Sequence, residues 1–248
     1  MLALELKDVK KTFRSRRGEV VAVDGVSLEV AERGIFGLLG MNGAGKSTLI
    51  GISMGLIRPD GGTARVFGGD PTDAAVRRLV NVSPQETAVA PMLTVGENLE
   101  FSARAYGMTR SDARDAARRM AESIGLGDRV GDRAGRLSGG MMRRLSVGMA
   151  AVTSPKLVFL DEPTLGLDVV CRRGLWRYIR ETAESAAVVL TTHYLEEAEA
   201  LCDRIAVMAG GRIVAVGSAA ELKEKSGAEN FEDAFLRLAG EELYDEEK

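Results

Sequence analysis

The chain has 248 residues, of which 45% are hydrophobic and 28% are charged, and its formal net charge is −3. Such a composition is ordinary for a globular protein with a sizeable core, and the slightly acidic balance disfavours nucleic acid as the main partner. Cys171 and Cys202 are too few and too poorly spaced for a disulfide framework or a zinc site, so reduced thiols are expected. No stretch reaches the roughly 18 consecutive apolar residues of a membrane span, and the N-terminus lacks a signal-peptide pattern. Any link to a membrane is therefore expected to come through a partner.

The first part of the chain predicts a β layer beside a short buried strand. Leu2, Leu4 and Leu6 alternate with other residues, which is typical of an edge strand with one buried face. Further β-type runs, expected to complete an antiparallel layer, cover residues 20–23, 26–30 and 63–67. Turns are expected at 14–18 and 60–62, and a buried strand at 35–39 precedes a helix that covers 47–52.

The turn before that helix fits the pattern Gly-x-x-x-x-Gly-Lys-Ser/Thr, with the residues Gly40-Met41-Asn42-Gly43-Ala44-Gly45-Lys46-Ser47-Thr48. The backbone N–H groups of such a turn and the helix N-terminus attract phosphates. Lys46 is expected to reach the β- and γ-phosphates of a nucleotide, and the Ser47 hydroxyl to bind Mg²⁺. An ordinary glycine-rich turn is the alternative. The strand, lysine and hydroxyl in their expected places favour the nucleotide site.

The sequence changes character after Gln85, where helical patterns follow one another without a strand. Helices are predicted at 94–106, 111–123 and 138–151, with a loop at 125–135. Thr94 and Ser111 are the expected N-caps, and Glu97 completes a capping box with Thr94. These features predict a helical subdomain at 86–152, inserted into an α/β core that covers 1–85 and 153–217.

Alternating strands and helices then return, which is the pattern of parallel βαβ units. Strands are predicted at 157–160 and 187–191, helices at 170–183 and 195–201, and a terminal hairpin around Gly210-Gly211. A helical extension with an acidic tail is expected at 218–248. The strand at 157–160 is wholly apolar and ends at Asp161-Glu162. Asp161 is expected to hold Mg²⁺, and Glu162 to polarise the water that attacks the γ-phosphate, whereas a solvated acidic turn is the alternative.

Four motifs in this order resemble the nucleotide-binding subunit of an ABC transporter: 40–47, Leu137-Ser138-Gly139-Gly140, Asp161-Glu162-Pro163-Thr164 and His193. The resemblance covers residues 2 to 217, nearly the whole chain. It implies a P-loop NTPase fold of the α/β class, with a RecA-like parallel sheet, an antiparallel β layer and an inserted helical subdomain. It also implies that ATP and Mg²⁺ are bound and that ATP is hydrolysed.

The resemblance assigns further residues to the nucleotide. Phe13 matches the aromatic position that stacks on adenine, although a lone phenylalanine after a strand is also typical of a core. Gln85 matches the glutamine that links Mg²⁺ and the attacking water to the helical subdomain. His193, the only histidine of the chain, matches the switch residue that contacts the γ-phosphate. A single histidine is otherwise more often a surface or core residue.

The resemblance also implies a pair of subunits that share two nucleotides. Ser138, Gly139 and Gly140 match the signature that caps the γ-phosphate held by the other subunit, and small residues at a helix start suit an anion. Asp168 matches the loop that crosses the interface between the subunits. ATP would hold the pair closed and hydrolysis would release it, because only a ligand that favours the closed state can drive closure.

Several positions depart from the usual family pattern, and none of them is a phosphate, metal or water ligand. Met141 stands in place of glutamine, Leu165 in place of serine, and Val169 and Met41 in place of proline. The string from Leu137 to Ser146 resembles the branch of exporters of drugs, lipids, oligosaccharides and sodium.

The expected partners are a transmembrane permease and a second ATP-binding subunit, most simply an identical one, at the cytoplasmic face of the membrane. Phe101 lies apart from the apolar stripe of its helix and either faces the permease or packs within the subdomain. A soluble ABC ATPase with a regulatory or repair role is the main alternative. The single cassette and its compact insert favour the transporter subunit. A nucleotide-binding module without hydrolysis is disfavoured because Gln85, Asp161, Glu162 and His193 are all present.

Overall fold

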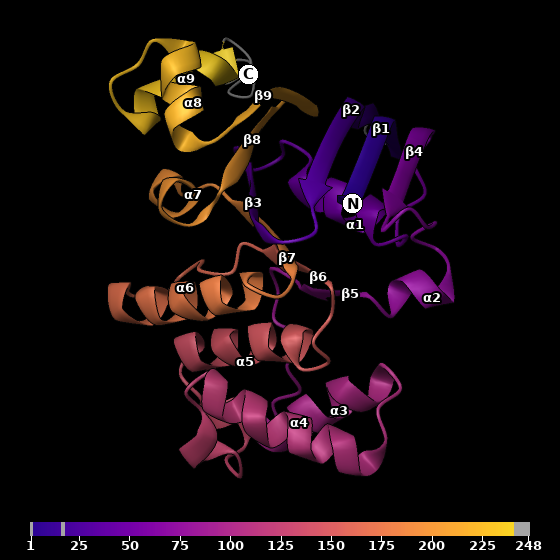
Figure 1. Ribbon diagram of the computed structural model, residues 1–248, viewed down its shortest axis with the longest axis vertical. Helices are drawn as coiled ribbons and strands as arrows, with labels where there is room; N and C mark the ends of the chain where they lie inside the picture. Colours follow the sequence, from indigo (N-terminus) through magenta and orange to yellow (C-terminus); the bar gives the residue numbers. More distant parts are fainter. Residues whose placement is uncertain (1, 16–17, 241–248) are drawn as a thin grey trace. The chain divides into compact units, whose positions relative to one another are not determined.

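The computed structural model describes residues 2–15 and 18–240 and divides into two compact units (Figure 1). The first unit consists of Met1–Arg77 and Val189–Lys248, and the second of Arg78–Val188. The predicted helical insertion at 86–152 lies within the second unit. That unit also contains two strands and a helix from outside the predicted insertion.

A three-stranded antiparallel sheet opens the first unit, in the order β2-β1-β4. Its strands are β1 (Leu2–Ser15), β2 (Gly18–Ala31) and β4 (Gly61–Val66). Leu4 pairs with Val30 on one side and with Val66 on the other. The prediction that β1 is an edge strand is therefore wrong, because alternation reports a buried face and not the number of neighbouring strands. Two residues of the predicted turn at 14–18 lie outside the described residues.

The second sheet of this unit runs in the order β7-β3-β8-β9. Strand β3 (Gly34–Leu39) is parallel to β8 (Arg204–Ala209), which forms the predicted hairpin with β9 (Arg212–Gly217). Every residue of β7 (Ala187–Thr192) is buried, as is expected for a central strand of a parallel sheet. Helix α1 (Lys46–Ser53) follows β3, and helix α7 (Leu195–Leu201) follows β7. A short helix that was not predicted, α2 (Ala74–Arg77), ends the N-terminal segment of this unit.

The chain after β9 forms two helices, α8 (Ala219–Ser226) and α9 (Phe231–Ala239). Ser218 and Glu221 form a capping box at the start of α8, and α8 ends at Gly227, which has a φ of 66°. Phe231 and Phe235 bury their rings, so this predicted extension is part of the core of its unit. The acidic tail lies outside the described residues.

Four helices and two strands make the second unit. Strands β5 (Val80–Ser83) and β6 (Leu157–Asp161) are parallel neighbours. The helices are α3 (Val95–Ala105), α4 (Arg110–Ser123), α5 (Gly139–Ala151) and α6 (Val169–Ala183). The predicted loop at 125–135 contains the 3₁₀ turn η1 (Gly127–Arg129) and the start of a second, η2 (Ala134–Arg136).

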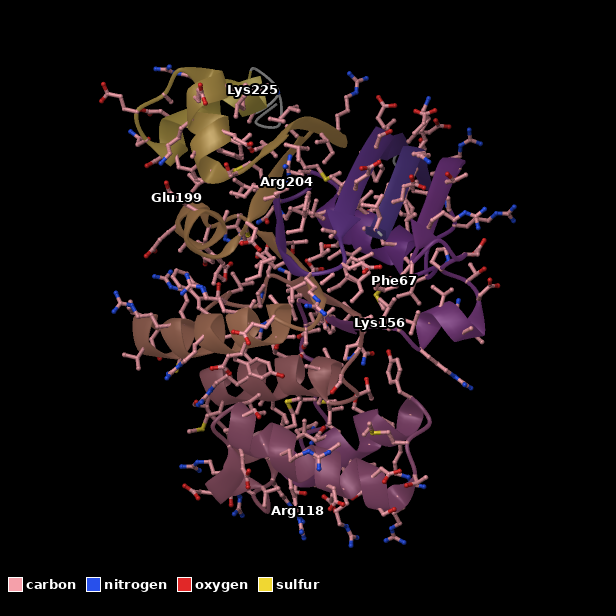
Figure 2. All side chains as sticks on the ribbon, viewed as in Figure 1. Phe67, Arg118, Lys156, Glu199, Arg204 and Lys225 are labelled. Atoms are coloured by element: carbon pink, nitrogen blue, oxygen red, sulfur yellow. The ribbon has the colours of Figure 1, made fainter. Side chains whose placement is uncertain are left out.

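The helices of this unit share one apolar core, to which α3, α4 and α5 each contribute buried residues such as Leu99, Ala117 and Leu145. On α4 the alanines are buried and the arginines are exposed, as Arg118 in Figure 2 illustrates. The capping box of Thr94 and Glu97 is confirmed. The N-cap of α4 is Thr109 and not Ser111, because the Thr109 hydroxyl accepts a hydrogen bond from the backbone N–H of Asp112.

Candidate functional site

The backbone of the phosphate-loop segment is fixed by its neighbours in the first unit. Gly45 is the N-cap of α1 and has a φ of 100°, a conformation that side chains other than hydrogen disfavour. A Cβ atom at this position would collide with the carbonyl oxygen of Ala22 and would lie 2.9 Å from Cε of Met208. Ala44 is buried, whereas Met41, Asn42 and Ser47 are exposed. Packing against Ala22 and Met208 therefore fixes the backbone of the loop, and its exposed residues remain accessible to a ligand.

Lys46 lies in the concavity of this loop and is only 6% exposed. Its Nζ atom donates hydrogen bonds to the carbonyl oxygens of Gly40, at 2.8 Å, and Met41, at 3.0 Å. A buried ammonium held by carbonyl dipoles is a compact positive charge at the helix start, where phosphate oxygens are favoured.

His193 directly follows β7, and β7 ends beside the start of the loop. The backbone N–H of Gly40 donates to the carbonyl oxygen of Thr192 at 3.4 Å. The Thr192 hydroxyl accepts from the backbone N–H of Tyr194, whose ring lies 4.2 Å from the imidazole of His193 between centroids. The first unit thus brings together the phosphate loop and the predicted switch histidine.

Phe13 lies on β1 and exposes 43% of its surface. The Nζ atom of Lys11 lies 5.5 Å from the centroid of the phenyl ring, within the range of a cation–π contact. The alternative of a core phenylalanine is therefore wrong. Stacking on adenine stays a prediction.

The two predicted carboxylates come from the end of β6 in the second unit. All five residues of β6 are buried, and Asp161 and Glu162 are themselves only 8% and 6% exposed. The alternative of a solvated acidic turn is therefore wrong. Glu162 has a φ of 49°, in the left-handed region that non-glycine residues adopt infrequently and that clusters at functional sites.

Arg143 of α5 holds the backbone around these carboxylates, and this residue was not singled out from the sequence. Its guanidinium group is buried and donates to the carbonyl oxygens of Asp161, Glu162 and Pro163. It also donates to the carbonyl oxygens of Pro84 and Gln85, at 2.9 and 2.8 Å. The sequence offered one indication of this role, a pair of arginines in a helix that is otherwise largely apolar. The second unit thus brings the backbone of Gln85 together with that of Asp161 and Glu162, while Gln85 itself is exposed.

The predicted signature residues open α5. Ser138 is the N-cap, and its hydroxyl accepts a hydrogen bond from the backbone N–H of Met141 at 3.3 Å. A Cβ atom on Gly140 would lie 3.0 Å from Sγ of Cys171, so α5 begins close to the start of α6. A Cβ atom on Gly139 would meet nothing within 4 Å in the part of the chain that the structure describes. Packing explains the glycine at 140 but not the glycine at 139.

Asp168 is the N-cap of α6. Its Oδ1 atom accepts from the backbone N–H groups of Cys171, at 2.8 Å, and Val170, at 2.9 Å. The hydrogen bond from Cys171 is the largest cause that lowers the pKa of the Asp168 carboxyl, because it stabilises the ionised form. The residue therefore has a structural role at this helix in addition to any role at an interface between subunits.

The predicted residues fall into two groups, one in each unit. Phe13, the phosphate loop and His193 belong to the first, and the remaining candidates, Gln85, Ser138, Gly139, Gly140, Asp161, Glu162 and Asp168, belong to the second. Among the described residues no cluster of three or more His, Cys, Asp or Glu side chains forms a metal site. No helix within 2–15 and 18–240 is both long and apolar enough to cross a membrane.

Comparison with known proteins agrees with the motifs. The family model described as ABC transporter matches residues 23–165. The daunorubicin/doxorubicin resistance ATP-binding protein DrrA of Streptomyces peucetius is 42% identical over 97% of this chain and 74% of its own length. The linearmycin resistance ATP-binding protein LnrL of Bacillus subtilis is 37% identical over 91% of this chain and 72% of its own.

A solved structure of an ATP-binding subunit of an ABC transporter has a TM-score of 0.84 and 28% identity to this chain. The likeness covers 97% of this chain and all of that one. The predicted P-loop NTPase fold and the family resemblance are both confirmed.

Proposed function

The chain belongs to the ABC transporter family, and we propose that it is the ATP-binding and ATP-hydrolysing subunit of an exporter with a separate membrane permease. The observation that carries the proposal is that the chemical requirements for hydrolysis are met by buried groups. Lys46 supplies a fixed positive charge in a phosphate-binding loop, and Glu162 supplies a carboxylate at the end of a buried strand. Binding and hydrolysis of a nucleotide need both.

Each predicted residue then has a distinct task in the reaction. Lys46 and the loop N–H groups bind the β- and γ-phosphates. Glu162 accepts a hydrogen bond from the attacking water and takes up its proton as the water oxygen bonds to the γ-phosphorus. The bond from the γ-phosphorus to the oxygen that bridges it to the β-phosphate breaks in the same reaction, and ADP leaves with that electron pair. Gln85 and His193 orient the water and the γ-phosphate, and the exposed ring of Phe13 stacks on the adenine.

The donors of this chain suit Mg²⁺. The ion prefers oxygen ligands, keeps several waters, and is held by one or two protein groups together with substrate phosphates. The Ser47 hydroxyl, the Asp161 carboxylate and the Gln85 amide oxygen are such donors. When bound, the ion neutralises charge on the phosphates.

A second copy of the chain would complete each site. We assign Ser138, Gly139 and Gly140 to the γ-phosphate bound by the other subunit, with Asp168 at the interface. The free space around Gly139 supports this assignment, because packing against the described residues does not require glycine there. Paired subunits would act on a permease at the cytoplasmic face of the membrane, and the drug-resistance relatives support export as the direction.

The substitution Glu162→Gln tests the proposed function. It removes the proton acceptor and keeps the shape, so turnover should fall by about 10²- to 10⁴-fold while ATP binding remains. Phosphate release, binding of a fluorescent ATP analogue and light scattering should show a dimer that persists in ATP. Glu224→Gln, on the exposed face of α8, should hydrolyse ATP normally. Undiminished hydrolysis by Glu162→Gln would remove Glu162 from this role.

The permease is tested separately by tagging this chain in its own cells. Extraction in detergent should co-purify a protein with membrane-spanning helices, and ATPase activity should remain with that complex. Recovery of the tagged chain from the soluble fraction alone would favour a regulatory or repair ATPase instead.

A further inference from the structure

We propose that Arg143 is a positioning residue for hydrolysis, which sets the direction of the Glu162 side chain by holding the backbone on both sides of it. The inference rests on the proposed function, because it concerns the residue assigned there as proton acceptor. All the groups involved belong to the second unit.

The hydrogen bonds of Arg143 use every donor of its guanidinium group. Nε donates to the carbonyl oxygen of Pro163, Nη1 to those of Pro84 and Gln85, and Nη2 to those of Asp161 and Glu162. A guanidinium group has five N–H donors in one plane, so the five acceptors match its capacity. Three consecutive carbonyl groups, from Asp161 to Pro163, are thus held by one rigid fork.

The guanidinium group of Arg143 bonds to the backbone at a residue with an uncommon conformation. Glu162 has a left-handed conformation, which an L-residue adopts only when its surroundings stabilise it. The orientation of the peptide groups before and after Glu162 determines where its side chain points. Fixing those carbonyl groups therefore fixes the direction in which the carboxylate leaves the backbone.

The same fork connects the carboxylates to Gln85 and to α5. Gln85 follows β5, whereas α5 begins directly after its N-cap, the signature residue Ser138. Arg143 bonds to the carbonyl oxygens of residues 84 and 85 and is itself part of α5. The backbone of the proposed proton acceptor Glu162, the backbone of Gln85 and helix α5 are therefore connected through one rigid group.

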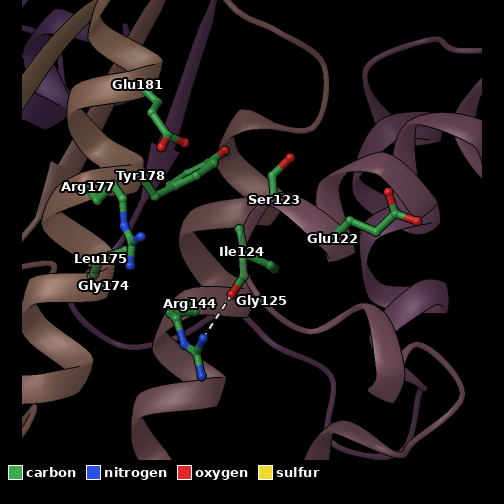
Figure 3. A pocket seen from close by; sticks show the side chains of 10 residues that line it. All are labelled: Glu122, Ser123, Ile124, Gly125, Arg144, Gly174, Leu175, Arg177, Tyr178 and Glu181. Atoms are coloured by element: carbon green, nitrogen blue, oxygen red, sulfur yellow. Dashed lines mark hydrogen bonds between the residues drawn. The ribbon is translucent and has the colours of Figure 1, made fainter.

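The neighbouring Arg144 provides a matched control, because it is an arginine on the same helix with a different task. Its Nη1 donates to the carbonyl oxygen of Ile124 at 3.1 Å, the bond drawn in Figure 3. It lines a pocket of about 290 Å³ together with Tyr178 and Glu181, none of which is assigned to hydrolysis.

The experiment compares Arg143→Lys with Arg144→Lys in the full chain. Lysine keeps the charge but offers three donors from one atom, so it cannot hold five carbonyl groups in a plane. We expect Arg143→Lys to lower kcat by about 10- to 100-fold, the effect of a small misplacement of a catalytic group. The KM for ATP and the binding of a fluorescent ATP analogue should stay close to those of the unsubstituted chain. The melting temperature should fall, because buried carbonyl groups lose their donors. Arg144→Lys should keep its kcat.

A double variant distinguishes an effect of Arg143 on the direction of Glu162 from a general effect on the stability of the fold. In the Glu162→Gln background there is no proton acceptor left to orient, so Arg143→Lys should lower the residual turnover by less than about twofold. Full activity of Arg143→Lys would overturn the inference. So would equal losses in binding and turnover, or a loss of the same size in both backgrounds. If Arg143→Lys does not fold, Arg143→Gln replaces it, and failure of both to fold would make Arg143 a folding residue only. An inactive unsubstituted chain would instead count against the proposed function.

Discussion

The phosphate loop of the first unit and the carboxylate strand end of the second unit fix their functional groups in different ways. In the loop, glycine conformations and close backbone neighbours set the shape, and Lys46 bonds to carbonyl groups only five and six residues before it. At the strand end, a single side chain from another helix, Arg143, holds the backbone of Glu162. The comparison teaches that a local motif and a long-range brace can serve the same reaction. Only the local motif is visible as a pattern in the sequence.

The largest effect expected for the loop is on nucleotide binding. Lys46→Ala removes charge-assisted hydrogen bonds to the phosphates, which should weaken ATP binding by about 100-fold. Titration with a fluorescent ATP analogue measures this, and Lys225→Ala on the exposed side of α8 should bind normally. An unchanged affinity of Lys46→Ala would show that the backbone of the loop alone suffices for ATP binding. Lys46 would then not be the functional group of the loop in this comparison.

Two glycine substitutions sharpen the contrast between internal packing and ligand contact. Gly45→Ala forces a Cβ atom against Ala22 at a positive φ, and it should lower the stability by about 1–3 kcal/mol.

Gly139→Ala should leave the melting temperature unchanged or slightly raised, because the position has free space and alanine favours helices. The same variant, combined with Glu162→Gln, should fail to form the ATP-bound dimer in light scattering. A persistent dimer would show that the signature glycine is not needed for contact with the other subunit.

A smaller effect is expected at the N-cap of α6. Asp168→Ala removes the acceptor for two backbone N–H groups and should lower the melting temperature by about 2–4 °C at pH 7. Asp168→Asn keeps a good N-cap and is the control. Because the folded-state pKa of Asp168 is below its ordinary value of 3.8, its charge stabilises the fold above that pH. The advantage of aspartate over alanine should therefore shrink toward that of the neutral asparagine as the pH falls through the lowered pKa. An advantage that stays constant down to pH 2 would contradict this.

The smallest effect is expected for Met141→Gln. The backbone N–H of Met141 makes the contact to Ser138, and any residue supplies it, while the side chain packs at the edge of the helical core. The ATPase rate should change by less than about twofold. A large loss would show that the methionine is specifically required.

Much of the architecture could be predicted because it depends on neighbours in the sequence. Buried strands, the capping box of Thr94 and the glycine turn at 210–211 all follow from residues a few positions apart. The position of β1 in its sheet could not be predicted, because it depends on two strands that pair only after folding.

The prediction for Phe101 left two roles open, and the structure excludes one of them. Its side chain is 66% exposed, so it does not pack within the subdomain. A contact with the permease stays a prediction. The periodicity placed Phe101 away from the buried stripe of α3, but no pattern within one chain indicates what an exposed ring meets.

Arg143 shows which part of the candidate site could not be predicted from the sequence. The five carbonyl oxygens to which it donates lie 18 to 20 and 58 to 59 residues away. Every residue type has such a carbonyl group, so a sequence pattern does not reveal these contacts. A motif can indicate Glu162 as the proposed proton acceptor, whereas the group that we propose to orient it becomes visible only in three dimensions.

The hydrogen bonds from Arg143 to residues 85, 161 and 162 end on main-chain oxygen atoms, so these bonds do not depend on which side chains the three residues carry. A duplicated gene can therefore lose its carboxylate by a single mutation and still encode a folded subunit that holds nucleotide. If the subunits pair as we propose, an assembly of one such copy and one active copy would hydrolyse only one of its two nucleotides. The architecture and the chemistry of this subunit are in this sense free to evolve at different rates.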